Sequence, residues 1–569
     1  MKNCSGDFGG RAVLDRAGAP VRPDRQRTCL LRNPLALPAA RAPGPAHRLG
    51  AGGWDALPPF RSRPANMVRW ARRFGFFLLA VSLGGFYGFW GTVLPPAFII
   101  LLYLPLLALF GLVLWVMPDD RALGGGANWA MFLAFTAVTF LWPNYLGLSL
   151  PGAPVLSLRR VVGLSLMGVF FLALASSRAA RAQLAETLTG FPLLWKLLLG
   201  FALVQIAAMA AADSWYLAYR FWLNAFHAWI VLFFIAVFVF ARPGRIVRWA
   251  QWIAGCAILV ALIAIAEQFT RHVLWADHIP SFLRVDSEDV ARILTPSFRG
   301  TRYRSQAIFG VSLSLAEFLA LASPLMIHLL VIARSALERL ALAAGLVAVV
   351  LGIVFTQARL GFVGLLMGGL VYLFLYGLIR LRRDRTDLIG PAIAYGYAAS
   401  LAALYVLIMS VDGLRIRVFG SSTAQSSNDA REIQFDMAPP VILQSPIVGH
   451  GPGRGAEALG FTTPGGLVTI DSYLLSIVLD YGVLGFLLFY GMLVAALAMT
   501  FRLALNIAGQ PAEDRREASF ALPLCAMIAA FFMIKTVLSQ EENHSLIFMV
   551  YGAVIVLAHR ARRAGAGLS

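Results

Sequence analysis

The stretch TQARLGFVGLLMGGLVYL, residues 356–373, decides the fold class of this chain. A single charged residue, Arg359, precedes an unbroken apolar block, and about 20 such residues cross the hydrocarbon core of a bilayer. Backbone groups find no water in that core, so a crossing segment must satisfy its own hydrogen bonds as a helix. Blocks of the same kind recur along most of the chain. The sequence therefore predicts an all-α polytopic membrane protein.

The composition of the whole chain agrees with this prediction. Its 569 residues are 59% hydrophobic and 14% charged, with a mean hydropathy of +0.73. Soluble domains carry about 25% charged residues, so a water-soluble class is excluded. The net charge of +19 comes almost entirely from arginines between the apolar blocks, which is typical of membrane topology signals. We therefore expect membrane lipids, and no nucleic acid, among the partners.

Hydropathy predicts about 14 transmembrane helices. They are expected near residues 74–92, 96–116, 127–147, 160–176, 194–212, 222–241, 247–266, 310–333, 340–357, 361–379, 389–410, 474–500, 519–538 and 545–559.

Arginine-rich connections give this set of helices an orientation. With the N-terminus inside, the basic connections 241–248, 332–340, 380–385 and 559–563 all fall on the cytoplasmic side, as the positive-inside rule requires. The predicted location is a bacterial inner membrane, with both termini cytoplasmic. The outward connections are then 143–157, 267–309 and a long periplasmic loop, 411–472, before the last three helices.

Residues 1–66 differ from the membrane domain predicted at 67–569. They are rich in Arg, Pro, Ala and Gly and have too few large apolar residues to bury a core. The preferred interpretation is a disordered tail or a start assigned too far upstream, because Met67 opens a natural entry to the first helix. A transit-type peptide is the remaining alternative.

Arginines in the outward segments are the candidate binding residues. Arg299, Arg302 and Arg304 precede a helix, Arg359 follows a tight turn, and Arg431 lies early in the long loop. Positive charge is disfavoured on this side of the membrane, so a ligand is expected to require it. Several arginines suit a pyrophosphate, whose oxygens they bind in pairs. Snorkelling to lipid headgroups, or an ion pair within the loop, is the structural alternative for each.

Four landmarks carry a resemblance to a known family. They are RSQAIFGVSLSLAEFLALASPL (304–325), TQARLGFVGLLMGGLVYL (356–373), AREIQF followed by SPIVGHGPG (430–453), and IDSYLLSIVLDYGVLGF (470–486). In this order they resemble the O-antigen ligase and O-antigen or exopolysaccharide polymerase superfamily. The resemblance covers residues 96–560, with its specific part between 300 and 490. It implies a substrate that is an undecaprenyl-pyrophosphate-linked glycan on the periplasmic face.

The resemblance also implies roles for particular residues. By position, Arg359 and Arg431 look like the arginines that engage the donor pyrophosphate, and Arg304 and Arg302 are added from their charge and place. The ligase branch has a catalytic His before the helix that follows the long loop, and Asp471 stands there in this chain. A carboxyl is a weaker base than an imidazole at neutral pH. This departure favours a polymerase-like enzyme over a lipopolysaccharide core ligase. His450, between two glycines, is interpreted as a turn residue.

The predicted function is metal-independent transfer or polymerisation of a polyprenyl-pyrophosphate-linked glycan onto a saccharide or lipid-linked acceptor. The pathway would be O-antigen or exopolysaccharide biosynthesis, and no cofactor is expected. Export or chain-length proteins are the expected protein partners. Three alternatives remain at this stage, of which the first two are a transporter or flippase of lipid-linked sugars and a core O-antigen ligase. A non-catalytic, lipid-binding member of the superfamily is a third.

Overall fold

The structure is a computed structural model that describes most of the chain after residue 125. The described ranges are 126–148, 155–283, 285, 287–383, 388–413, 415, 422–463, 466, 468–507, 515–537 and 540–565, with five scattered earlier positions (74, 75, 78, 82 and 86). Apart from those positions, the tail 1–66 and the first two predicted spans lie outside the described residues. The elements named below all lie in one compact unit, Ser82–Ser569.

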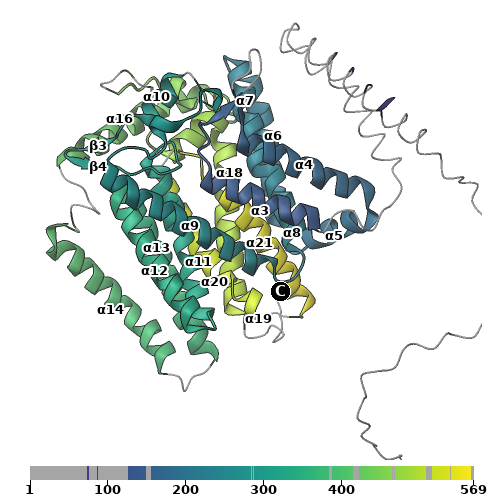
Figure 1. The fold of residues 1–569 in the computed structure, drawn as a ribbon, viewed down its shortest axis with the longest axis vertical. Helices are drawn as coiled ribbons and strands as arrows, with labels where there is room; N and C mark the ends of the chain where they lie inside the picture. Colours follow the sequence, from purple (N-terminus) through teal and green to yellow (C-terminus); the bar gives the residue numbers. More distant parts are fainter. Residues whose placement is uncertain are drawn as a thin grey trace, which may run out of the picture. The chain divides into compact units, whose positions relative to one another are not determined.

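Helices make up nearly all of the described elements (Figure 1). The helices are α3 (Gly126–Leu141), α4 (Leu158–Ser176), α5 (Arg178–Leu188), α6 (Pro192–Ala210), α7 (Trp215–Ala225), α8 (Leu232–Phe240), α9 (Arg245–Thr270), α10 (Glu288–Leu294), α11 (Ser312–Ile332), α12 (Ala336–Phe355), α13 (Arg359–Arg383), α14 (Ile389–Ser410), α16 (Ser422–Gln444), α17 (Gly455–Leu459), α18 (Tyr473–Leu505), α19 (Arg515–Ala518), α20 (Ala521–Lys535) and α21 (His544–Arg563). A π-helical segment, η1 (Phe226–Val231), joins α7 to α8, and short 3-10 turns lie at η2 (Ala276–His278) and η3 (Ser281–Leu283). Two antiparallel ribbons pair β1 (Gly147–Leu148) with β2 (Leu156–Ser157), and β3 (Phe298–Arg299) with β4 (Arg302–Tyr303).

The described helices include ten that are long and apolar enough to cross a membrane. The bent helix α14, with a 52° change of direction, is an eleventh if its two halves form one span. Each of these coincides with a predicted block. The block predicted at 127–147 is shorter than expected, because α3 ends at Leu141 after 16 residues. The chain is therefore a multi-pass membrane protein.

Helices α11, α20 and α21 form the buried centre of the bundle. The spans that contain them, Ser312–Ile332, Arg515–Lys535 and His544–Arg563, are 78%, 72% and 89% buried over their most apolar stretches, so other helices surround them. Helix α13 packs closely against this centre through Gly361, Gly364 and Gly368. A Cβ atom at Gly364 would lie 2.5 Å from Cδ1 of Ile534 on α20 and 3.1 Å from Cβ of Ala320 on α11, so a larger residue would have to displace the Ile534 side chain. This packing fixes the N-terminal end of α13, where Arg359 stands.

Helix α18 is broken at Gly482, whose φ of +67° is left-handed. The rings of Tyr473 and Phe489 are 5.4 Å apart, although 16 residues of straight helix would separate them by about 24 Å. The first half of α18 therefore folds back against the second half. The break leaves the backbone carbonyls of Leu479 and Asp480 without donors from the second part of the helix. They accept hydrogen bonds instead from the backbone N–H groups of His450 and Gly451.

The turn that fills this break contains His450. Its backbone N–H donates to Leu479 at 2.7 Å, and its Nε2 lies 3.0 Å from the carbonyl oxygen of Val441. The flanking residues Gly449 and Gly451 both have positive φ angles. These contacts make His450 a turn residue, as predicted from its two glycine neighbours.

Candidate functional site

The β3–β4 hairpin lies on the short turn between α12 and α13. Three consecutive carbonyls of that turn, at residues 355–357, accept hydrogen bonds from Ser305 N–H (3.1 Å), Arg304 Nε (3.4 Å) and Arg299 Nη1 (3.1 Å). Gln357 adopts a left-handed backbone with φ of +53°, which exposes these carbonyls to the hairpin. The interaction brings Arg299 and Arg304 beside the first turn of α13.

Glu267, near the end of α9, holds the other side of the same segment. Its carboxylate is fully buried and accepts hydrogen bonds from the backbone N–H groups of Gln306 (3.0 Å) and Ala307 (2.9 Å). The hydroxyl of Ser305 donates to the carbonyl of Ala264, also on α9. The hairpin is thus fixed between α9 and the α12–α13 turn, so its arginines have a defined position.

Four arginines from three different segments come together here. Arg359 interacts electrostatically with both Arg299 and Arg431, and Arg304 interacts with Arg299. Burial, and then the charge of Arg299, lower the pKa of Arg304. A group of like charges raises its own electrostatic energy, which a doubly charged anion would relieve. We call Arg299, Arg304, Arg359 and Arg431 the arginine cluster.

Arg302 lies at the edge of this cluster. It pairs with Arg299 across the β3–β4 hairpin, so the two side chains project from the same face of the ribbon. Unlike the partly buried Arg304, Arg302 is exposed. The structure therefore brings together Arg304, Arg359 and Arg431 from the predicted set and leaves Arg302 at the solvent rim.

Asp471, the predicted catalytic residue, is attached to the helix that carries Arg431. The side-chain oxygen of Gln434 accepts a hydrogen bond from Asp471 N–H at 2.9 Å. Gln434 is fully buried and lies one turn after Arg431 on the same face of α16. This contact places the half-buried Asp471 beside the face that carries Arg431. The sequence predicts a long loop over 411–472, whereas this segment contains α16, a helix of 23 residues.

A buried ion pair lies at the same end of the bundle, and the sequence prediction missed it. Lys535 Nζ lies 3.0 Å from Glu317 Oε1, and both side chains are completely buried. Asn543 donates a second hydrogen bond to Glu317 at 2.9 Å. The ammonium of Lys535 also lies 5.2 Å from the ring centre of Tyr473. The available signal was a single charged residue within each apolar block, which is a mark of functional importance in membrane helices.

Glu541 is a second carboxyl close to the start of α18. The hydroxyl of Tyr473, two residues after Asp471, donates to Glu541 at 3.3 Å. Burial raises the pKa of Glu541 to about 7, and the opposing effects of Lys535 and the Tyr473 hydrogen bond are smaller. A carboxyl with this pKa is a better proton acceptor at neutral pH than an ordinary one. Only long-range contacts create this environment, so the sequence of a short connection could not reveal it.

This arrangement combines fixed positive charge with two carboxyls of different surroundings. Guanidinium groups held in place before a reaction stabilise oxygens that become negative as a bond breaks. A carboxyl within reach of a hydroxyl accepts its proton. Among the described residues, no group of three or more His, Cys, Asp or Glu side chains is arranged to hold a metal ion.

Part of this site lies in a segment that matches a known protein family. The family model described as O-antigen ligase matches residues 344–490, and no curated protein matches the chain. The matched segment contains Arg359, Arg431 and Asp471, whereas Arg304, Lys535 and Glu541 lie outside it. The match over residues 344–490 supports a relationship to the O-antigen ligase and polymerase superfamily, whose members are membrane enzymes that act on lipid-linked glycans in surface polysaccharide synthesis.

Proposed function

We propose that this protein transfers a glycan from an undecaprenyl-type polyprenyl pyrophosphate to a saccharide hydroxyl, without a metal ion, on the periplasmic face of a bacterial inner membrane. The observation that supports this most directly is the arginine cluster, in which three chain segments place like charges together. Guanidinium groups bind phosphate oxygens through paired hydrogen bonds and remain charged in any environment. A pyrophosphate is the ligand that matches this charge.

The proposed reaction is a single displacement. An oxygen of the acceptor hydroxyl forms a bond to the anomeric carbon of the donor sugar, and the bond from that carbon to the pyrophosphate oxygen breaks. The electron pair leaves with the polyprenyl pyrophosphate, whose charge the arginine cluster stabilises. The acceptor proton passes to a carboxylate of the protein. No oxidant, reductant or further reactant is needed.

Asp471 is the proposed proton acceptor, because of its family position and its attachment to the Arg431 helix through Gln434. Glu541 is the second carboxyl that fits this role, through its hydrogen bond with Tyr473. The aspartate at this position favours a polymerase-like enzyme for O-antigen or exopolysaccharide over a core ligase. Comparing Asp471→Asn with Glu541→Gln for polymer formation would assign the base, which contributes about 10²–10⁴-fold in rate.

The experiment that tests the proposal replaces Arg359 and Arg431 with lysine. Lysine keeps the charge but loses the planar fork. A hydrogen bond to a charged group contributes about 1.5–3 kcal/mol, so turnover should fall about tenfold or more. Polymer and lipid-linked donor would be measured in cells with equal amounts of membrane protein. Arg334→Lys is the matched control, because Arg334 is exposed at the other end of α11.

A flippase of lipid-linked sugars is the second candidate function. The buried pair of Lys535 and Glu317 favours it, because transporters place charges inside the membrane along a substrate path. The two functions differ in where the donor accumulates when Arg359 is replaced. Donor on the periplasmic face supports the transferase, whereas donor on the cytoplasmic face supports the flippase. Normal polymer from both lysine variants would contradict the pyrophosphate role.

A further inference from the structure

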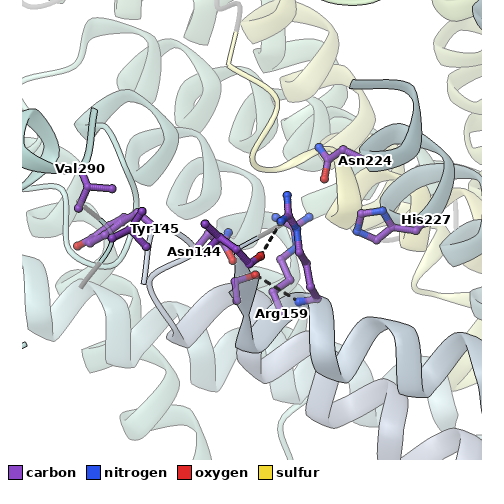
Figure 2. Close-up of a pocket in the computed structure, with 10 residues that line it drawn as sticks. Asn144, Tyr145, Arg159, Asn224, His227 and Val290 are labelled. Atoms are coloured by element: carbon purple, nitrogen blue, oxygen red, sulfur yellow. Dashed lines mark hydrogen bonds between the residues drawn. The ribbon is translucent and has the colours of Figure 1, made fainter. Parts of the chain in front are cut away.

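A separate pocket opens near the start of α4. Its volume is about 260 Å³, and it lies outside the segment that matches the family model. The polar side chains that line it are Asn144, Tyr145, Ser157, Arg159, Arg160, Asn224 and His227. Figure 2 shows Asn224 and His227 on one side of Arg159 and Asn144 and Tyr145 on the other.

Two buried polar atoms in this pocket have no hydrogen-bond partner within the described protein. They are Oδ1 of Asn144, an acceptor, and Nε of Arg159, a donor. Buried polar atoms are nearly always hydrogen-bonded, so a pair of this kind at a pocket wall indicates a bound polar group. The other end of the Arg159 guanidinium is fixed by a 2.7 Å hydrogen bond to the hydroxyl of Ser545 on α21. The side chain is therefore held in place with Nε still able to donate.

Positive charge is concentrated in the same place. Arg160 interacts electrostatically with Arg220, and its guanidinium is fixed by a 2.6 Å hydrogen bond to the carbonyl of Val155. Glu542 is the acidic group that interacts with Arg159. Two adjacent arginines with one acidic neighbour leave net positive charge at the pocket, which favours a ligand carrying a carboxylate or phosphate.

The π-helical segment supplies the opposite wall. Asn224 stands at the end of α7, and His227 lies in the π-helical turn that follows. His227 Nδ1 lies 2.7 Å from the carbonyl oxygen of Leu223, so the ring has a fixed orientation and its Nε2 remains available. Single π-helical turns occur often at functional sites, because the extra residue redirects side chains. Amide and imidazole groups of this kind hydrogen-bond to sugar hydroxyls.

Helix α10 connects this pocket to the arginine cluster. Val290 of α10 lines the pocket, and the carbonyl of Ile293, one turn later, accepts a hydrogen bond from the side chain of Gln306. Gln306 follows Arg304 by two residues, and its backbone N–H binds Glu267. Helix α10 thus contacts both the pocket and the segment that carries Arg304, so the two sites are linked through one short helix.

We propose that this pocket binds the acceptor, a saccharide that carries a carboxylate or phosphate group. Arg159 and Arg160 would bind that group, and Asn144, Asn224 and His227 would bind hydroxyls. The inference rests on the proposed transferase function, since it assigns the second substrate of that reaction. The pocket combines these polar groups with Val155, Val285 and Val290, and its volume of about 260 Å³ suits a sugar unit.

Binding of small probes to the full chain in lipid nanodiscs tests this assignment. Saturation-transfer NMR would compare glucuronate and glucose 6-phosphate with uncharged glucose. At least one charged sugar should bind about tenfold more tightly than glucose, because of its charge-assisted hydrogen bonds. Arg160→Gln and Asn224→Trp should abolish this preference. Asn224→Trp fills the pocket with a larger side chain and leaves in place the hydrogen bonds that hold Arg159 and Arg160. A loss of preference in this variant therefore reports on the space in the pocket and not on displaced arginines. Arg334→Gln is the surface control.

Binding of undecaprenyl pyrophosphate to the same variants separates the two proposals. Asn224→Trp should retain this binding, and Arg359→Lys should lose most of it. Loss of undecaprenyl pyrophosphate binding in Asn224→Trp would overturn the acceptor assignment and make the pocket part of the donor site. Equal binding of glucose and both charged sugars would also overturn it. Unchanged undecaprenyl pyrophosphate binding in Arg359→Lys would instead contradict the proposed function.

Discussion

The two ends of the helix bundle both gather arginines, but their surroundings differ. At one end Glu517 pairs with Arg560 at 2.8 Å and accepts hydrogen bonds from the backbone N–H groups of Gly244 and Ile246. We call this the Glu517 end. At the other end, which we call the Arg359 end, the electrostatic neighbours of Arg359 include two further arginines. At the Glu517 end a carboxylate lies between the arginine and the backbone donors that it binds, whereas at the Arg359 end arginines from three segments lie near one another.

This difference distinguishes a structural role from a binding role. The Glu517 carboxylate joins α19 to α21 and to the start of α9, so its charges stabilise helix packing. The arginine cluster contributes no such attraction among its members, because like charges repel. An anionic ligand bound among these arginines would replace their mutual repulsion with attraction to the ligand. The following predictions, from the largest expected effect to the smallest, compare a residue at each end.

The largest effect is expected for the buried pair at the Arg359 end. Lys535→Met leaves Glu317 buried without its counter-charge, which should destabilise the protein by about 3–5 kcal/mol. The matched change at the Glu517 end, Arg563→Met, removes a solvent-exposed ion pair with Glu186 and should leave stability almost unchanged. Thermal unfolding in detergent would measure both. Similar losses from the two variants would show that burial does not distinguish the ends.

The double variant Lys535→Met with Glu317→Leu refines this prediction. Replacing both charges with apolar side chains removes the unpaired carboxylate, so much of the stability lost in Lys535→Met should return. Glycan transfer would be measured at a temperature where all variants are folded. If stability recovers but transfer does not, the pair also positions the site, because Lys535 contacts the Tyr473 ring.

Glu541 should make stability depend on pH. Its pKa in the folded protein, about 7, lies above the ordinary value of 4.5, so the folded state binds the proton more tightly than the unfolded state. The contribution of Glu541 to stability is therefore fully present below about pH 4.5, is lost as the pH rises from 4.5 to 7, and changes little above that range. The difference of about 2.5 pKa units corresponds to about 3 kcal/mol. Glu541→Gln should be more stable than the natural protein at pH 8.

Unfolding temperatures at pH 4.5 and pH 8 would check this. The advantage of Glu541→Gln should disappear at the lower pH, where the glutamate is protonated and resembles glutamine. An equal advantage at both values would mean that the residue titrates normally and that its burial has little effect on its pKa. Transfer activity in the same variant is an independent measurement, since the stability prediction holds whether or not Glu541 accepts the acceptor proton.

A smaller effect is expected from lysine substitutions that keep charge. Arg304→Lys loses the Nε contact to Thr356 and the fork that binds phosphate oxygens, so glycan transfer should fall about tenfold. At the Glu517 end, Arg562 donates a hydrogen bond to the carbonyl of Thr189. Arg562→Lys should change glycan transfer less than about twofold. Polymer yield at equal protein level would measure both. Equal losses would remove the distinction between a ligand site and a packing contact.

The fold was largely predictable from hydropathy, because a helix in lipid must be long and apolar. The break in α18 was not predictable, since Gly482 in LDYGVLGF is also compatible with a continuous helix. It depends on carbonyls at Leu479 and Asp480 that find donors in a turn about 30 residues earlier in the chain. Such long-range satisfaction of backbone groups has no local signature.

The candidate site was partly predictable for the same reason. Arg359 and Arg431 stood out because charge is disfavoured near the outer surface of a membrane helix. Asp471 was identified from its place in a family motif. Glu541 and Arg159 could not be selected from the sequence, because their importance comes from burial and from neighbours on α18 and α21. The sequence therefore shows which residues are charged, but the burial and the neighbours of each charged side chain depend on the fold.

The smallest effect is expected at Arg302, the exposed member of the predicted set. Its side chain lies at the rim of the hairpin, so its field is screened by salt beyond about 8 Å at physiological ionic strength. Arg302→Gln should lower transfer less than about threefold at low salt and have almost no effect at high salt. Arg304→Gln, in the partly buried position two residues later, should lower transfer at both salt concentrations. Transfer rates across a salt series would separate the two. If Arg302→Gln matches Arg304→Gln at every salt concentration, the hairpin must close over the ligand and bury both arginines when the donor binds.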